Sequence, residues 1–256
     1  MYTLVFSSQK GGVAKTETVR AFASGLARRG HRVLAVDSDP QANLTVASGI
    51  MPMQADMTLY DIYERTAGAE DTIQATAGGY DIIPGDLRLT TADLKYSGRA
   101  GREYRLKRAL KPLQGQYDYC IIDTPPNIGL LTENAFLAAQ GIIIPVCPDL
   151  YSLQGLSQLA DLLEVLRTDL EDMDARVEGV LLTRIDDRKR ALTGPITEQI
   201  ELLARNMGTR LFRARIREAA VVQKSALAQK PLFDYDAGAE VTRDYEEAVD
   251  EFLEGR

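Results

Sequence analysis

The amino-acid sequence predicts an α/β protein with a doubly wound, mostly parallel sheet and helices on both of its faces. Short runs rich in β-branched residues alternate along the chain with stretches of helical periodicity, as βαβ units require. Several of these runs are apolar at nearly every position, which is typical of parallel strands buried on both faces. No linker rich in Pro, Gly or Ser divides the chain, so residues 1–256 are expected to form one domain.

The elements follow from these patterns in chain order. Strands are expected at residues 3–8, 32–39, 80–85, 117–123, 141–146, 177–183 and 211–216. Helices are expected over residues 15–29, 153–167 and 195–205. Gly30 follows the first helix at a position where a left-handed residue commonly ends a helix. Because ligands of doubly wound sheets bind beyond the carboxyl ends of the strands, a site is expected in the loops after residues 8, 37, 123, 146 and 183.

Composition excludes several classes of protein. No apolar run approaches the roughly 20 residues that a membrane span needs, and the first residues lack the pattern of a signal peptide. Cys120 and Cys147 both fall in strand-like runs, so neither a disulfide scaffold nor a multi-cysteine metal site is expected. His31 is the only histidine, which argues against histidine-clustered zinc chemistry and Ser-His-Asp hydrolysis. The expected setting is a reducing cytoplasm.

The net charge of −7 is unevenly distributed along the chain. Residues 232–256 contain nine acidic and two basic side chains, so the rest of the chain is neutral overall. Residues 184–231 contain 11 basic and 5 acidic side chains. A pI near 5.0 argues against a surface coated with nucleic-acid-binding charge, but it is compatible with a confined basic patch.

The strongest motif is SSQKGGVAKTET, residues 7–18, directly after the first expected strand and at the start of the first expected helix. A phosphate-binding loop needs this strand–loop–helix setting. Gly11 and Gly12 allow a tight turn that aims backbone N–H groups inward, and the helix N-terminus adds a positive dipole. Lys15 would bridge the β- and γ-phosphates, and the Thr16 hydroxyl would ligate Mg²⁺. The motif predicts a P-loop NTPase fold that binds ATP and Mg²⁺.

Within this motif, residues 10–16 (KGGVAKT) resemble the deviant Walker A motif, KGGVGKT, of the ParA/MinD family of ATPases, whose mark is the extra lysine, here Lys10. Three further segments resemble the family in order and spacing: VLAVDSDPQANLT (33–45), YDYCIIDTPPNIGLLTENAF (117–136) and GIIIPVCPDLYSLQGLSQL (141–159). The similarity extends over essentially the whole chain and is densest in residues 3–160. Within the family, the sequence is most similar to the short ParA/Soj partition ATPases.

The resemblance implies a role for each residue of the site. The nucleotide would be held by Lys10, Gly11, Gly12, Val13, Ala14, Lys15, Thr16 and Glu17. The metal side would consist of Thr16, Asp37 and Asp123, of which Asp123 ends an apolar strand and could hold the Mg²⁺ shell through water. Catalysis would rest on Lys10, Lys15 and Asp39: Asp39 would position the attacking water, and Lys10 would cross a nucleotide-sandwich homodimer to the partner's ATP. Adenine would lie near Thr183–Arg184 and Ile216–Ala219.

The resemblance also implies what the ATPase acts on. It would bind DNA without sequence preference when ATP is bound. It would associate with the nucleoid and act with a ParB-like partner. Candidate DNA contacts lie in the basic stretch: Arg184, Arg188, Lys189, Arg190, Arg213, Arg215, Arg217 and Lys224. Residues 213, 215 and 217 would share one face of a strand. Relatives tend to carry arginine near position 221, where this chain has Val221 and Val222. A second basic stretch, residues 99–111, is interpreted as a helix surface.

Two other functions remain open for this fold. A MinD-like membrane ATPase would need a basic amphipathic C-terminal helix, whereas RDYEEAVDEFLEGR is amphipathic but acidic, so no membrane partner is expected. A metallocluster reductase would need cysteines at a dimer axis, and a ligase would need a pocket for a small substrate. Co-sedimentation with lipid vesicles and with DNA, each with and without ATP, separates these alternatives.

Two residues of the loop depart from the family pattern. Ala14 replaces the usual glycine before Lys15, which costs roughly 1 kcal/mol if its φ angle is positive. Glu17 replaces the usual threonine after Thr16. Its carboxylate either repels the phosphates and weakens nucleotide binding, or pairs with Arg20 and turns away from them.

Overall fold

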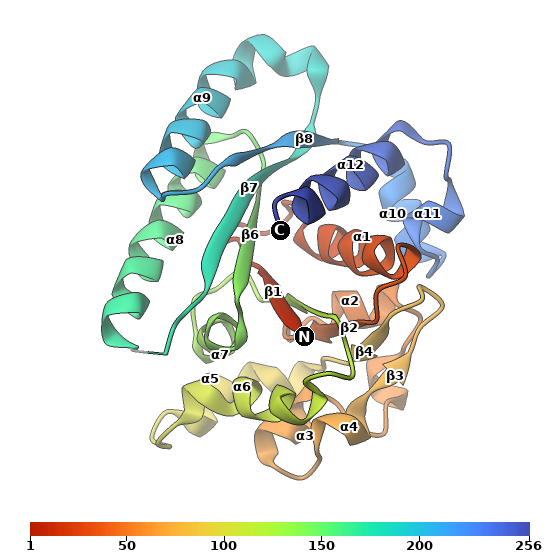
Figure 1. Ribbon diagram of the computed structural model, residues 1–256, viewed down its shortest axis with the longest axis vertical. Helices are drawn as coiled ribbons and strands as arrows, with labels where there is room; N and C mark the ends of the chain where they lie inside the picture. The colour runs from red at the N-terminus through yellow and green to blue at the C-terminus, as the bar shows by residue number, and fades with distance from the viewer. Residues whose placement is uncertain (171) are drawn as a thin grey trace.

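A single eight-stranded sheet forms the centre of the protein (Figure 1). The computed structural model describes residues 1–170 and 172–256, without the side chains of Asp93, Asp187 and Arg190. The strands are β1 (Tyr2–Phe6), β2 (Val33–Asp37), β3 (Gln74–Ala75), β4 (Asp81–Ile83), β5 (Tyr119–Asp123), β6 (Gly141–Val146), β7 (Arg176–Ile185) and β8 (Leu211–Arg217). Their order across the sheet is β3-β4-β2-β5-β1-β6-β7-β8.

All neighbouring strands pair in parallel except β3, which pairs antiparallel with β4. The register brings Phe6 at the end of β1 and Asp37 at the end of β2 level with Asp123 at the end of β5. The central strands therefore end at one edge, where the loops after residues 6, 37 and 123 meet. This is the edge at which a doubly wound sheet binds its ligand.

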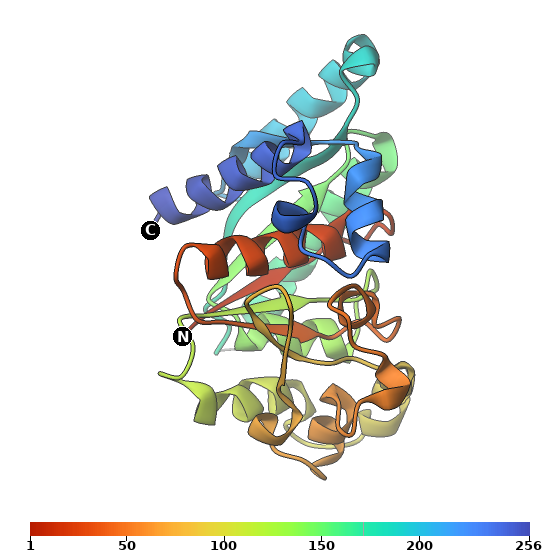
Figure 2. The same ribbon diagram turned by 90° about the vertical axis from the view of Figure 1, so that its right-hand side faces the viewer.

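Helices cover both faces of the sheet (Figure 2). They are α1 (Lys15–Arg28), α2 (Asn43–Ala47), α3 (Leu59–Glu64), α4 (Ala69–Thr72), α5 (Ala92–Tyr96), α6 (Arg105–Leu110), α7 (Leu130–Ala138), α8 (Leu150–Asp169), α9 (Arg190–Asn206), α10 (Ala220–Leu227), α11 (Leu232–Tyr235) and α12 (Glu240–Glu254). One face carries α1 and α10 to α12, and the other carries α3 to α9. This is the doubly wound arrangement that the sequence predicts.

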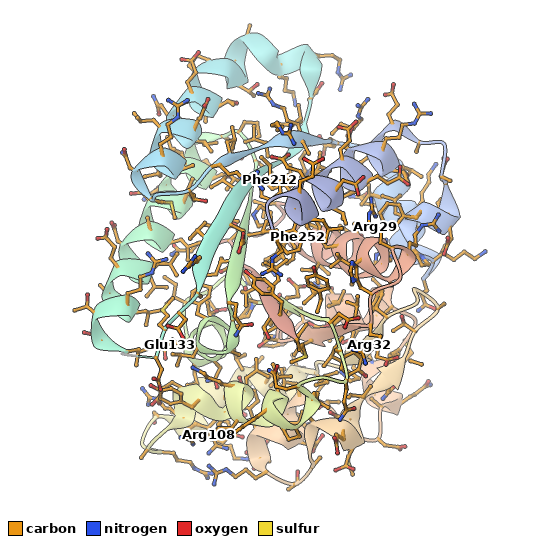
Figure 3. The ribbon with its side chains drawn as sticks, viewed as in Figure 1. Arg29, Arg32, Arg108, Glu133, Phe212 and Phe252 are labelled. Atoms are coloured by element: carbon orange, nitrogen blue, oxygen red, sulfur yellow. The ribbon has the colours of Figure 1, made fainter. Side chains whose placement is uncertain are left out.

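Alternation along the strands builds a separate core on each face. In β1, Leu4 and Phe6 belong to the cluster beneath α1 and α12, whereas Val5 belongs to the cluster beneath α7. Phe252 of α12 and Phe212 of β8 lie in the first of these clusters, in the region between the helix and the strand (Figure 3). The acidic C-terminal segment is therefore anchored by its apolar face.

The expected strands and helices are confirmed, with differences at their ends. The long helix α8 begins at Leu150, three residues before the expected start, because the Asp149 side chain accepts a hydrogen bond from the Ser152 N–H at 2.9 Å and caps it. Helix α9 continues in the N-terminal direction through Pro195, in its second turn. The two-residue strand β3 was too short to give an alternating pattern. The prediction that both cysteines lie in strands is wrong for Cys147, which follows β6 directly, although both are buried.

Among the helices of residues 1–170 and 172–256, none combines the length and apolar character that crossing a bilayer requires.

Candidate nucleotide-binding site

The loop between β1 and α1 has the backbone shape that a phosphate-binding turn requires. Gly12 has a φ of 77°, and Ala14 lies in the left-handed region with φ 57° and ψ 30°. Ala14 therefore carries the steric cost of about 1 kcal/mol that a glycine there would avoid. The first turn of α1 follows at Lys15, so its free N–H groups and dipole point into the loop.

Lys15 lies buried at the base of this loop and faces β5. Its Nζ donates to Oδ1 of Asp123 and to the main-chain oxygen of Thr124. The Thr16 hydroxyl donates to Oδ2 of the same aspartate at 2.6 Å. Lys15, Thr16 and Asp123 thus meet as the motif predicts, and Lys15 neutralises the carboxylate of Asp123 when no phosphate is present.

Asp37 is fully buried beside this group. Its Oδ2 accepts hydrogen bonds from the Thr45 N–H at 2.8 Å and the Thr45 hydroxyl at 2.7 Å. Burial, followed by the negative charge of Asp123, raises the pKa of Asp37 to about 7. Gly85 packs directly against Asp37, and a larger residue would not fit there. A Cβ atom at this position would lie 2.6 Å from the main-chain oxygen of Asp37. Lys15 pairs with Asp123, whereas no ion pair to Asp37 is found among the described side chains, so the site favours an additional cation.

Replacing Asp37 with asparagine is expected to stabilise the nucleotide-free, metal-free protein at pH 8 by at least about 1 kcal/mol. A carboxyl whose folded pKa is raised to about 7 contributes a cost that is absent near pH 4 and grows until the pH passes about 7. Urea unfolding of both proteins in a chelator, between pH 4 and 8, measures the difference. We expect it to shrink as the pH falls; a variant that is less stable at every pH contradicts this electrostatic account.

Asp39 follows Asp37 after the strand has ended. Its N–H donates to Oδ1 of Asp37 at 3.2 Å, and its own Oδ1 accepts from the Gln41 N–H at 2.9 Å. Burial raises its pKa, while the Gln41 N–H and the charge of Lys15 counteract that rise. Asp39 lines the cavity that faces the loop, where a water molecule could approach a bound phosphate.

Two of the cavities beside the loop share Gly12, Ala14 and Glu17 in their walls. The larger, of about 740 Å³, is lined by Lys10, Lys15, Thr16 and Asp39 together with parts of α2 and α10. The smaller, of about 240 Å³, is lined by Arg184, by Ile216 to Ala219 and by Tyr245. The residues expected near adenine thus surround a recess next to the loop. Thr183 is not among its lining residues: the side chain is buried, and its hydroxyl donates to the Val13 main-chain oxygen at 2.9 Å.

Glu17 forms an ion pair at 3.0 Å with Arg20, which lies three residues further along α1. Arg20 is buried, and it also donates to the Ser225 hydroxyl at 2.5 Å and the Lys230 main-chain oxygen at 3.1 Å. Burial raises the pKa of Glu17, which Arg20 counteracts. Glu17 nevertheless remains in the wall of both cavities, so pairing with Arg20 does not remove its charge from the site.

Replacing Glu17 with threonine is expected to tighten ATP binding several-fold at low salt, with a smaller gain at high salt, because a negative charge leaves the cavity wall. The same change should lower the free energy of unfolding by about 1–3 kcal/mol, because buried Arg20 loses its carboxylate. Titration calorimetry and urea unfolding measure the two effects. Glu17→Gln is the matched control, since it removes the charge but keeps an oxygen for Arg20. Equal ATP dissociation constants for wild type and both variants would refute the first effect.

Lys10 forms an ion pair within its own chain. Its Nζ lies 2.5 Å from Oδ2 of Asp149, the residue that caps α8. Burial raises the pKa of the Asp149 carboxyl, but Lys10 and the Ser152 N–H lower it by more. The pKa of Asp149 therefore lies below its usual value. Lys10 lines both the larger cavity at the loop and a second cavity formed by the starts of α8 and α9. A role for Lys10 across a dimer interface stays a prediction.

The donor set around Asp123 fits magnesium in the form that accompanies a nucleotide. In the described part of the chain there is no group of three or more His, Cys, Asp or Glu side chains arranged to hold a metal ion. Mg²⁺ commonly takes only one or two protein oxygens and completes its shell with phosphates and water. The Thr16 hydroxyl and the paired carboxylates of Asp123 and Asp37 supply such a set.

The structure places most of the candidate DNA contacts against acidic side chains. Arg184 pairs with Glu218, Arg188 and Lys189 pair with Asp186, Arg213 pairs with Glu251 and Glu254, and Arg217 pairs with Glu240 and Asp244. Residues 213, 215 and 217 do share the outward face of β8, alternating with buried residues. Arg190 lies outside the described side chains. Among the side chains that the structure describes, no carboxylate lies within 4.0 Å of the remaining candidates, Arg215 and Lys224.

Three residues that position the site were missed from the sequence. Thr45 orients Asp37 from eight residues away, Gly85 lies in the loop after β4, and Asp149 holds Lys10. Thr45 and Asp149 lie within segments that resemble the family, and this resemblance was the only indication in the sequence that they belong to the site. No such indication exists in the sequence for Gly85, because only folding brings this residue next to Asp37.

A phosphate-type loop after the first strand of a parallel sheet, with a buried aspartate at the end of β5, defines a P-loop NTPase. Residues 1–174 match a family model described as an AAA domain. The chain is 37% identical to the sporulation initiation inhibitor protein Soj of Bacillus subtilis, over 96% of this chain and 97% of Soj. It is 34% identical to the chromosome partitioning protein ParA of Myxococcus xanthus, over 90% of this chain and 78% of that one.

Solved structures share the same architecture. Apo McdA from Cyanothece superposes with a TM-score of 0.88 at 25% identity, covering 99% of both chains. Cobyrinic acid a,c-diamide synthase of Mycobacterium smegmatis, with bound ADP and magnesium, superposes with a TM-score of 0.84 at 28% identity, covering 97% of this chain and 92% of the synthase. The chain belongs to the ParA/Soj-type partition ATPases of the ParA/MinD family.

Proposed function

We propose that the protein is a Mg²⁺-dependent ATPase that dimerises on ATP and binds DNA without sequence preference. In this role it partitions a chromosome or plasmid together with a ParB-like protein, in the cytoplasm and on the nucleoid. The observation that carries the proposal is that Lys15, Thr16 and Asp39 line one cavity beside a left-handed phosphate loop, while Asp123 bonds to both Lys15 and Thr16. Residues 1–256 would act as one unit, since α12 packs against both α1 and β8.

Each residue would have a defined task in this reaction. Lys15 would leave Asp123 for the phosphates of ATP, and the loop N–H groups would hold the same oxygens. The Thr16 hydroxyl and Asp123 would hold Mg²⁺, which neutralises charge on the phosphates when bound. Asp39 would accept a hydrogen bond from the attacking water. Lys10 would exchange Asp149 for the ATP of a partner subunit.

The acidic C-terminal helix argues against the membrane alternative. Its apolar side chains, including Val241, Tyr245 and Phe252, are buried against α1 and β8, so they are committed to the core. The side that remains exposed is acidic and would be repelled by anionic lipid. A ligase role is the remaining alternative, because a synthase shares the fold at 28% identity.

Co-sedimentation tests the proposal directly. The protein is incubated with DNA of mixed sequence or with anionic vesicles, in each case with ATP and Mg²⁺, with ADP, or without nucleotide. We expect ATP-dependent sedimentation with DNA and none with vesicles. Sedimentation with vesicles alone supports the membrane role, and the absence of both leaves the ligase role and contradicts a partition ATPase.

A further inference from the structure

Basic side chains without an acidic partner gather at one place outside the nucleotide site. Residues 97–116 contain six basic side chains and one acidic side chain, Glu103. Five of the six cations are at least partly exposed and form what we call the α6 basic surface: Arg99, Arg102, Lys107, Arg108 and Lys111. Within the described chain, none of the five has a carboxylate within 4.0 Å.

The fold holds two of these five cations in place by stacking them on tyrosines. The guanidinium of Arg99 lies 5.3 Å from the ring centre of Tyr96, and that of Arg108 lies 5.6 Å from the ring centre of Tyr104. The sixth cation, Arg105, is buried, lies 4.4 Å from the Tyr96 ring and donates to the Tyr63 oxygen. Side chains held in this way lose little conformational freedom when they bind an anion.

A cavity of about 600 Å³ lies beside this surface, between α6 and the amino end of the sheet. Lys107, Arg108 and Lys111 line it, together with Tyr104. Asp172 is also in its wall, and its main-chain oxygen accepts a hydrogen bond from Lys107 at 3.2 Å. Figure 3 labels Arg108 among the side chains at this end of the molecule.

The chemistry of the surface suits a phosphate backbone better than a protein partner. Protein interfaces need an apolar core, and none of the exposed large hydrophobic side chains lies within residues 97–116. Unpaired cations, in contrast, release bound counterions when they meet nucleic-acid phosphates. The arginines of β8 and of the loop after β7 are already neutralised by Asp186, Glu218 and the acids of α12, so they would release fewer.

We propose that the α6 basic surface is a contact surface of this protein for the DNA phosphate backbone. The inference rests on the proposed function, which requires DNA binding but does not say where the DNA lies. It assigns the contact to a stretch that the sequence alone interprets as an ordinary helix surface.

Three triple variants test the assignment. The first, Arg99→Ala/Arg108→Ala/Lys111→Ala, removes exposed cations of the α6 basic surface. The second, Arg28→Ala/Arg32→Ala/Arg205→Ala, removes three exposed cations that pair with acids elsewhere and is the matched control. The third, Arg188→Ala/Lys189→Ala/Arg213→Ala, removes cations of the contact that the sequence predicts, each of which pairs with an acid. DNA binding is measured with ATP and Mg²⁺ between 50 and 300 mM salt, and ATP turnover without DNA serves as the check of folding.

We expect the first variant to bind DNA at least tenfold more weakly, with the slope of log affinity against log salt reduced by about 2–3. The control should stay within twofold of wild type and the third variant within threefold, all with unchanged turnover in the absence of DNA. Wild-type affinity in the first variant overturns the inference while leaving the proposed function intact. Absence of ATP-dependent DNA binding in the wild type overturns the proposed function itself.

Discussion

Replacing Asp39 with alanine is expected to lower ATP turnover by about 10²- to 10³-fold, because the attacking water loses the carboxylate that orients it. ATP binding should stay within about threefold of wild type, since Asp39 lines the cavity but makes no hydrogen bond to Lys15 or Thr16. The variant should therefore accumulate as the ATP-bound dimer on DNA. Single-turnover hydrolysis and equilibrium nucleotide binding measure the two quantities separately.

Asp39→Asn is the matched control for this variant. It retains the hydrogen bond to the Gln41 N–H but loses the negative charge, so its turnover should also fall. Turnover within twofold of wild type in the alanine variant shows that Asp39 does not position the water. In that case Asp37, which is the other aspartate beside Asp123, becomes the residue to replace.

Replacing Lys10 with alanine is expected to abolish the ATP-dependent dimer and most of the turnover. Lys10 pairs with Asp149 and Lys15 pairs with Asp123, so the two lysines have separate carboxylate partners in their own subunit. Each monomer should still bind one nucleotide, because the phosphate loop and Lys15 are unchanged. Light scattering and stoichiometric nucleotide titration are the measurements.

Asp149→Asn separates the two contacts of Lys10. Asparagine remains a good helix cap for α8, so the fold should be retained, whereas Lys10 loses its ion pair within the chain. We expect this variant to dimerise with ATP at least as well as wild type. An unchanged ATP dimer in the Lys10→Ala protein removes the role of Lys10 across the interface.

The fold was predictable because the strands are short, apolar and separated by turn residues and helices. The core of the site was predictable as well, because Lys15, Thr16 and Asp123 lie in motifs at strand ends, and parallel strands bring their ends to one edge. The contacts that tune the site were not. Thr45, Gly85 and Asp149 act through distances that only the folded chain sets.

Surface charge was the least predictable feature. Arg213 and Arg217 read as a basic strand face in the sequence, but α12 returns along β8 and places Glu254, Asp244 and Glu240 against them. The carboxylates of Glu251 and Asp244 also accept hydrogen bonds from main-chain N–H groups of β8. Helix α12 therefore covers this edge strand. A count of charges along the chain does not reveal these pairs, because their acidic residues follow the arginines by 23 to 41 positions.

Light scattering of the wild-type protein with ATP and Mg²⁺, with ADP and Mg²⁺, and without nucleotide tests the central claim, that ATP at the loop after β1 assembles a dimer. We expect a mass near 28.2 kDa without nucleotide and with ADP, and about twice that mass with ATP. A mass that is the same in all three conditions contradicts the account.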